Sequence, residues 1–127
     1  MNKTNPKIVF FGAGVIGASV GGWIAPHYDN LYFLDQGAMA KALKEKGVTL
    51  YLGDKPANKT KVMVKVIDRI EEAADADIVV IGVKNYSLEA VAKTIKEKLG
   101  DKPVILSMAN GIINQEILPR YFSRVIY

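Results

Sequence analysis

Apolar runs of strand length recur along the chain and are separated by segments with a helical pattern. Runs that are apolar throughout are typical of parallel strands, because such strands are buried on both faces of the sheet. A further run begins at residues 124–127, where the sequence stops. The runs expected to be parallel strands are residues 8–11, 31–34, 77–83 and 104–108.

The segments between these runs carry the start and stop signals of helices. Gly47 and Gly100 follow two of them and predict C-terminal caps. Ser87 precedes the second of these two and is expected to be its N-cap. Pro26 and Pro119 end the other two, because proline cannot continue a helix. The predicted helices cover residues 15–25, 37–46, 88–99 and 114–118.

The pattern of apolar and polar residues changes after the second predicted helix. Residues 48–52 and 61–67 flank a polar stretch that contains Gly53 and Pro56, and the second run alternates lysine with valine. This pattern predicts a β-hairpin with one face in water, outside the alternation of strands and helices.

Together these elements predict an α/β fold, a Rossmann-like doubly wound and mostly parallel sheet with an inserted β-hairpin. Residues 1–127 have the size of one domain. Because a natural terminus inside a buried strand is unusual, we expect the chain to be the amino-terminal part of a longer protein. Its carboxy-terminal domain would then lie beyond this sequence.

Composition excludes several classes of protein. The chain has no cysteine, which rules out disulfides and cysteine-built metal sites, and it has no pattern of a serine triad or other metal cluster. The net charge of +4 is mild, and lysines of the hairpin supply much of it, so we favour a solvated face over a nucleic-acid surface. Residues 8–25 are uncharged, as in a signal peptide or membrane span, but five of them are glycine. We therefore expect a cytoplasmic protein.

The first candidate site is a glycine loop that follows the first strand and opens the first helix. Gly12 allows a tight turn, Gly14 allows close approach of a pyrophosphate, and Gly17 allows the helix to pack on the strand. The alternative is a glycine-rich turn that packs on itself, but an acid 18 residues after Gly17 favours a dinucleotide site. The loop reads Gly12, Ala13, Gly14, Val15, Ile16 and Gly17.

That acid is Asp35, at the end of the second strand. A carboxylate there can accept hydrogen bonds from both hydroxyls of the adenosine ribose, and it would repel a 2′-phosphate. The residue therefore favours NAD(H) over NADP(H). Two alternatives stay open, since Asp35 fits an ordinary loop that starts a helix, and Gln36 or Lys41 could hold a phosphate.

Two further sequences follow later strands, at the sheet edge where ligands bind in open α/β folds. Val83 and Lys84 follow the third of these strands, and a lysine there can reach a phosphate, a ribose or a substrate carboxylate. Asn110 follows the fourth, with Glu116 six residues later, and offers both a donor and acceptors. A surface lysine and an ordinary Asn-Gly turn are the alternatives.

The combination resembles the amino-terminal domain of ketopantoate reductases (2-dehydropantoate 2-reductases). The resemblance rests on GAGVIG at 12–17, VKNY at 83–86 and ANGIINQE at 109–116, together with the hairpin, and it spans essentially the whole chain. It implies that the glycine loop and Val83 bind the cofactor, that Lys84 lies by the cofactor and the active-site cleft, and that Asn110 contacts the nicotinamide ribose and the substrate. The implied reaction is reduction of 2-dehydropantoate, a 2-keto acid, to pantoate on the route to pantothenate and coenzyme A.

Two positions depart from the family pattern. Members that use NADPH usually have a basic residue at the position of Asp35, and a glutamine often stands where this chain has Ser87. The family's proton-donating lysine lies on the helical carboxy-terminal domain, so no catalytic residue is assigned here and the chain alone is expected to bind cofactor without turnover. The alternative function is a stand-alone NAD-binding regulatory or redox-sensing module. The sequence leaves a homodimer and the exact keto acid open.

Overall fold

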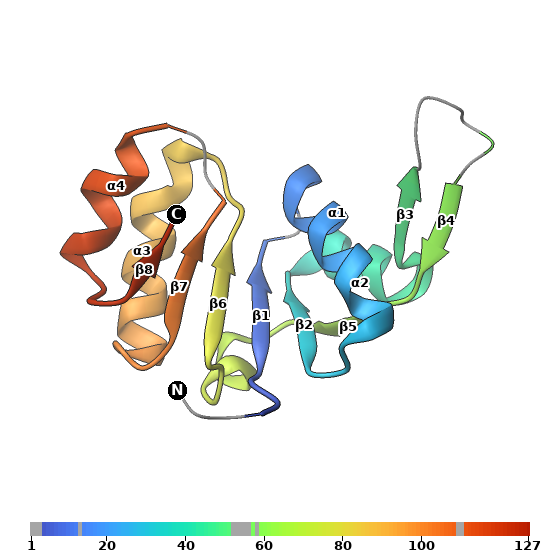
Figure 1. Ribbon diagram of the computed structural model, residues 1–127, viewed down its shortest axis with the longest axis horizontal. Helices are drawn as coiled ribbons and strands as arrows, with labels where there is room; N and C mark the ends of the chain where they lie inside the picture. Colours follow the sequence, from blue (N-terminus) through green and yellow to red (C-terminus); the bar gives the residue numbers. More distant parts are fainter. Residues whose placement is uncertain (1–3, 13, 52–56, 58, 109–110) are drawn as a thin grey trace.

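A computed structural model describes residues 4–12, 14–51, 57, 59–108 and 111–127 of the chain. Its centre is a six-stranded sheet in which every pair of neighbouring strands is parallel (Figure 1). The fold is therefore the doubly wound, Rossmann-like α/β fold expected from the apolar runs. In spatial order the strands are β5 (Lys65–Ile67), β2 (Leu31–Leu34), β1 (Ile8–Phe11), β6 (Ile78–Ile81), β7 (Val104–Ser107) and β8 (Val125–Ile126).

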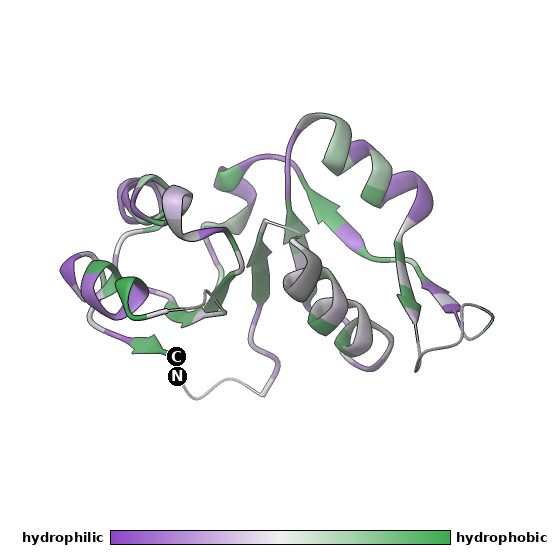
Figure 2. Ribbon diagram, turned by 90° about the horizontal axis from the view of Figure 1, so that it is seen from above, coloured by the Kyte–Doolittle hydropathy of each residue, from purple (hydrophilic) through white to green (hydrophobic). Residues whose placement is uncertain are grey.

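Strand β1 lies in the middle of the sheet. Ile8 pairs with Leu31 on one side and with Ile78 on the other, so the first strand joins the two halves. Figure 2 shows the central strands mainly in the hydrophobic colour. Their side chains are buried on both faces, as a parallel sheet between helices requires.

Helices and 3-10 turns connect the strands. The α-helices are α1 (Val15–Ile24), α2 (Gly37–Lys46), α3 (Asn85–Leu99) and α4 (Ile113–Ile117). The 3-10 turns are η1 (Ala25–His27), η2 (Ile70–Ala73) and η3 (Leu118–Arg120).

Two apolar cores lie on opposite faces of the sheet. Successive residues of a strand point to opposite faces, and Val9 belongs to one core while Phe10 belongs to the other. The core around Val9 includes Leu88 and Ile95 of α3, and the core around Phe10 includes Leu43 of α2. Strand β1 therefore contributes side chains to both cores.

The predicted hairpin is present and lies apart from the main sheet (Figure 1). Its strands β3 (Val48–Tyr51) and β4 (Lys59–Val62) are antiparallel. Val48 and Leu50 are buried against α1, where a Cβ on Gly22 would lie 3.1 Å from Val48 Cγ1 and 3.2 Å from Leu50 Cδ2. A small residue on α1 therefore lets the hairpin pack closely on this helix.

The prediction that residues 61–67 form one hairpin strand is wrong. Strand β4 ends at Val62, and after Met63 and Val64 the chain begins β5, which pairs parallel with β2 in the main sheet. This pairing covers the outer edge of β2, whose backbone groups would otherwise lack partners. A lysine followed by a valine occurs in both strands, so the pattern alone does not mark where the hydrogen-bonding partner changes.

Some predicted helix boundaries are also wrong, whereas both glycine caps are confirmed. Helix α3 begins at Asn85 with Lys84 as its N-cap, and Ser87 lies in its first turn, where its N–H donates to the Lys84 carbonyl at 2.9 Å. Gly47 and Gly100 cap α2 and α3 with φ of +66° and +69°. Pro119 lies within η3. Within the part of the chain that the structure describes, no helix has the length and apolar character needed to cross a membrane.

Candidate functional site

The candidate site lies where the chain leaves β1 and β6 at the carboxyl ends of these strands. The two strands are neighbours, but β1 leads to β2 on one side of the pair and β6 leads to β7 on the other. The connections therefore diverge at this edge of the sheet (Figure 1), where ligands usually bind in doubly wound folds. Two hollows lie at this edge, and we call them together the crevice.

The described glycines of the loop after β1 leave little room for side chains. Gly12 has φ +82°, and a Cβ on it would lie 3.1 Å from Val83 Cγ1. A Cβ on Gly14 would lie 3.0 Å from the Gly82 carbonyl oxygen, and one on Gly17 would lie 3.3 Å from the Gly12 carbonyl oxygen. The Gly12 N–H donates to the Leu34 carbonyl at 3.1 Å, which ties the loop to the end of β2. Backbone thus forms the base of the crevice.

Three helices begin at this crevice. Gly14, Gln36 and Lys84 are the N-caps of α1, α2 and α3, and no described side chain caps any of these helix starts. The first turn of an α-helix leaves its amide groups without intrahelical partners and carries partial positive charge. The crevice therefore presents several free amide groups to an anionic ligand.

A first hollow of about 310 Å³ brings together five of the residues predicted from the sequence. The glycine loop, the end of β2 and the connection after β6 all contribute to its lining. Lys84, which is exposed and is the N-cap of α3, is one of the lining residues. The lining residues are Gly12, Gly14, Asp35, Met39, Gly82, Val83, Lys84, Tyr86 and Ser87.

A second, adjoining hollow of about 420 Å³ has mainly apolar walls. It shares Gly12, Asp35, Val83 and Ser87 with the first hollow, so the two hollows adjoin within the crevice. Its shape and lining suit a flat, weakly polar ring. Ile70, Val91 and Thr94 line it as well, and nothing in the sequence distinguishes these three from other residues of η2 and α3. Its other lining residues are Phe11, Leu34 and Gln36.

Asp35 lies at the junction of the two hollows. Its N–H donates to the Ile67 carbonyl at 3.2 Å, and its Oδ1 accepts a hydrogen bond from the Gln36 N–H at 3.1 Å. Strand β5, which the sequence analysis did not place in the sheet, therefore helps to hold this carboxylate at the end of β2.

The remaining site residues predicted from the sequence are described only in part or not at all by the structure. Ala13 and Asn110 lie outside the described residues. Val15 and Ile16 form the first turn of α1, where only their backbone is described. Gly17 is buried beneath the loop, in the first turn of α1.

Asn114 is a buried polar residue near the end of β7 that the sequence analysis overlooked. Only 4% of it is exposed, and its Nδ2 donates to the Gly111 carbonyl. This contact joins Asn114 to the residue two positions before the start of α4. Glu116 is exposed on α4. A single asparagine in a five-residue helix leaves no periodic signal that would reveal its burial.

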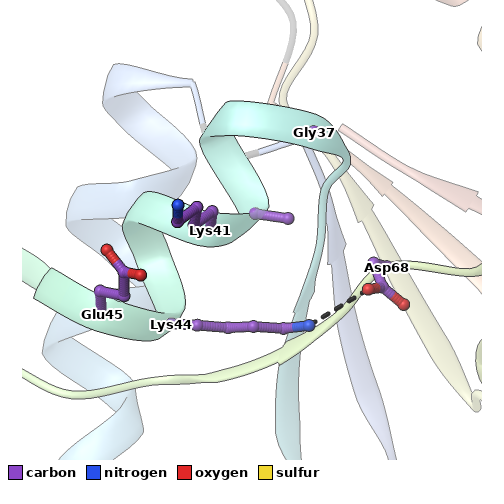
Figure 3. A pocket seen from close by; sticks show the side chains of 6 residues that line it. Gly37, Lys41, Lys44, Glu45 and Asp68 are labelled. Carbon is purple, nitrogen blue, oxygen red and sulfur yellow. Dashed lines mark hydrogen bonds and ion pairs between the residues drawn. The ribbon is translucent and has the colours of Figure 1, made fainter.

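A third hollow lies along α2 and is lined by charges of both signs (Figure 3). Lys44 Nζ lies 3.1 Å from Asp68 Oδ2, and this ion pair lowers the pKa of the Asp68 carboxyl. Lys41 also lines this hollow, and its ammonium group is directed away from Asp68. Lys41, which the sequence offered as an alternative phosphate-binding residue, therefore lines a different hollow from the two that Asp35 lines.

The chain is similar to known proteins in sequence and in fold. The chain is 32% identical over 120 residues to the 2-dehydropantoate 2-reductase of Archaeoglobus fulgidus, covering 94% of this chain and 37% of that protein. A crystal structure of a PanE/ApbA family ketopantoate reductase from Ralstonia eutropha matches with a TM-score of 0.78 at 22% identity, covering 94% of this chain and 39% of that one. A D-mandelate dehydrogenase with NADH and anilino(oxo)acetate matches with a TM-score of 0.71 at 20% identity, covering 94% and 39%.

The chain thus spans somewhat over a third of the length of these relatives. The model of one family, described as ketopantoate reductase PanE/ApbA, matches residues 8–127, which include every described element from β1 to β8. The chain belongs to the ketopantoate reductase (PanE/ApbA) family.

Proposed function

We propose that residues 1–127 form the dinucleotide-binding domain of an NAD(P)-dependent reductase of a 2-keto acid. Within this family, reduction of 2-dehydropantoate to pantoate is the reaction that we favour. The observation that carries the proposal is a single hollow at the carboxyl edge of the sheet that described glycines of the loop, Asp35 and Lys84 line together.

The residues of the crevice fit the parts of a dinucleotide one by one. The free amide groups at the start of α1, above the base formed by Gly12 and Gly14, would hold the pyrophosphate. The apolar walls of the second hollow, including Ile70 and Val91, would take the adenine ring. Asp35, between the two hollows, would accept hydrogen bonds from the adenosine ribose.

Substitution of Gly14 by valine tests the glycine loop. A side chain at this position meets the Gly82 carbonyl oxygen and fills the space above the base of the crevice, so NADH binding should be lost. Circular dichroism should show that the fold is largely retained, because Gly14 precedes α1 and has an ordinary φ of −61°. Unchanged affinity in a titration calorimeter would overturn the assignment of the loop.

The charge of Asp35 supports NAD(H) as the preferred cofactor over NADP(H), since a 2′-phosphate near a carboxylate is repelled. Titration should therefore show tighter binding of NADH than of NADPH, and Asp35→Ala should narrow the difference. Equal or tighter NADPH binding by the unaltered chain would refute the proposed ribose contact.

Bound nicotinamide would supply the hydride, and the protein would supply position and charge. Lys84, exposed beside the first hollow, is proposed to attract the substrate carboxylate or the cofactor, and Asn110 is proposed to contact the nicotinamide ribose and the substrate. The relatives are more than twice as long as this chain, and we propose that a helical carboxy-terminal domain completes the active site and donates the proton.

A further inference from the structure

Two large apolar side chains at the crevice are exposed to solvent. Tyr86 is 87% exposed and Met39 is 50% exposed, and both line the first hollow together with Gly12, Gly14 and Asp35. A large apolar side chain with so few contacts adds little to the stability of the fold. When exposed apolar side chains gather at a hollow, they mark a surface that is covered by a ligand or a partner.

The two side chains come from opposite sides of the crevice. Met39 lies in the first turns of α2, which follows β2, whereas Tyr86 lies in the first turn of α3, which follows β6. Strands β2 and β6 flank β1 on its two sides. A ligand that rests on the loop after β1 therefore has Met39 on one flank and Tyr86 on the other.

The base between these flanks consists largely of backbone. Gly12, Gly14 and Gly82 line the hollow without side chains, so a ligand would contact only their backbone, on the side that faces the sheet. A ligand on this base keeps its outer surface in water unless a flanking side chain covers it. The flexible thioether of Met39 and the planar ring of Tyr86 are suited to packing against a sugar or a base.

We infer that Met39 and Tyr86 are positioning residues that close from opposite sides on the adenosine diphosphate half of a bound dinucleotide. The inference rests on the proposed function and adds two residues to its binding site. Asp35 lines the same hollow as both side chains, which places them at the adenosine half rather than at the nicotinamide. The Tyr86 ring, and not its hydroxyl group, provides the contact.

Titration calorimetry with NADH, ADP-ribose and nicotinamide mononucleotide tests this inference on the whole chain. Tyr86→Ala and Met39→Ala should each weaken NADH and ADP-ribose roughly tenfold, which corresponds to about 55 Å² of apolar surface covered by the ligand. Nicotinamide mononucleotide should bind these variants and the unaltered chain alike, and Tyr86→Phe should retain the original affinity.

Matched controls are available on the hairpin side of the molecule. Tyr51 is 59% exposed and Met63 is 56% exposed, and Tyr51→Ala and Met63→Ala should leave all three affinities unchanged. Weakened NADH binding without weakened ADP-ribose binding would overturn the inference, as would unchanged affinity in both crevice variants. If the unaltered chain binds neither NADH nor ADP-ribose, the proposed function itself fails.

Discussion

The turn between α2 and the hairpin depends on one glycine, and alanine at that position should destabilise the fold. Gly47 has φ +66° and ψ −154°, a conformation that is essentially restricted to glycine. Gly100 caps α3 with nearly the same angles, φ +69° and ψ −150°. At both positions, a residue with a Cβ should therefore lose about 1–3 kcal/mol of unfolding free energy through backbone strain.

The surroundings of the two glycines differ. A Cβ on Gly47 would lie closer to the Val62 carbonyl oxygen than the 3.0 Å that real Cβ atoms keep, and it would lie 3.0 Å from Met63 Sδ. A Cβ on Gly100 would meet no atom within 4 Å. Relief at Gly47 requires a shift of the backbone of β4, and overpacking of this kind costs about 1–3 kcal/mol. Gly47→Ala should therefore lose roughly twice as much stability as Gly100→Ala.

Urea unfolding followed by circular dichroism measures both losses, with Gly100→Ala as the matched control. The unfolding free energy should fall by about 1–3 kcal/mol in the control and by about 2–6 kcal/mol in Gly47→Ala. NADH affinity should stay unchanged in both, because Gly47 and Gly100 follow the ends of α2 and α3 that are remote from the crevice. Equal losses would refute the steric argument, and no loss in either variant would refute the backbone argument.

Three further predictions follow from the packing, the charges and the proposed domain arrangement. Gly21→Ala should lower the melting temperature more than Gly22→Ala. A Cβ on Gly21 would overlap the fully buried ring of Phe33, whereas one on Gly22 would lie 3.1 Å from Val48 Cγ1. Equal melting temperatures of the two variants would contradict this steric argument. Hydrogen bonds from the hydroxyl and N–H of Ser123 lower the pKa of Asp101, so Asp101→Asn should be less stable than the unaltered chain near neutral pH. The difference in unfolding free energy between the two proteins should shrink as the pH falls below about 4, the pKa of an aspartate in the unfolded chain, because protonated Asp101 no longer accepts these hydrogen bonds as a carboxylate. A difference in unfolding free energy that does not depend on pH would contradict this role of the carboxylate. The 127-residue chain should bind NADH yet show no appreciable reduction of 2-dehydropantoate in a spectrophotometric assay, and robust turnover would overturn the proposal that another domain completes the site.

Much of the fold could be predicted because its signals are local. The bounds of β1, β2 and α2 agree with the predicted runs, since each apolar run ends at a residue that favours a turn or a cap. The glycine loop and Asp35 could be placed at one edge because parallel strands end together. The comparisons confirm the family that the three sequence motifs indicated.

The parts that were missed depend on contacts between distant segments. Strand β5 joins the sheet through pairing with β2, and nothing in its own sequence distinguishes it from the end of the hairpin. Met39 and Tyr86 look like ordinary helix residues until the topology places α2 and α3 on either side of the glycine loop.

The central place of β1 has a consequence for synthesis on the ribosome. The half-sheet of β5, β2 and β1 can assemble once residue 67 has emerged, but β1 then presents a free edge until β6 follows at residues 78–81. Unpaired strand edges are where nascent chains pair wrongly or exchange strands with a neighbour. The strand that leads into the glycine loop, although central in the finished sheet, therefore has an edge open to mispairing while the chain is being made.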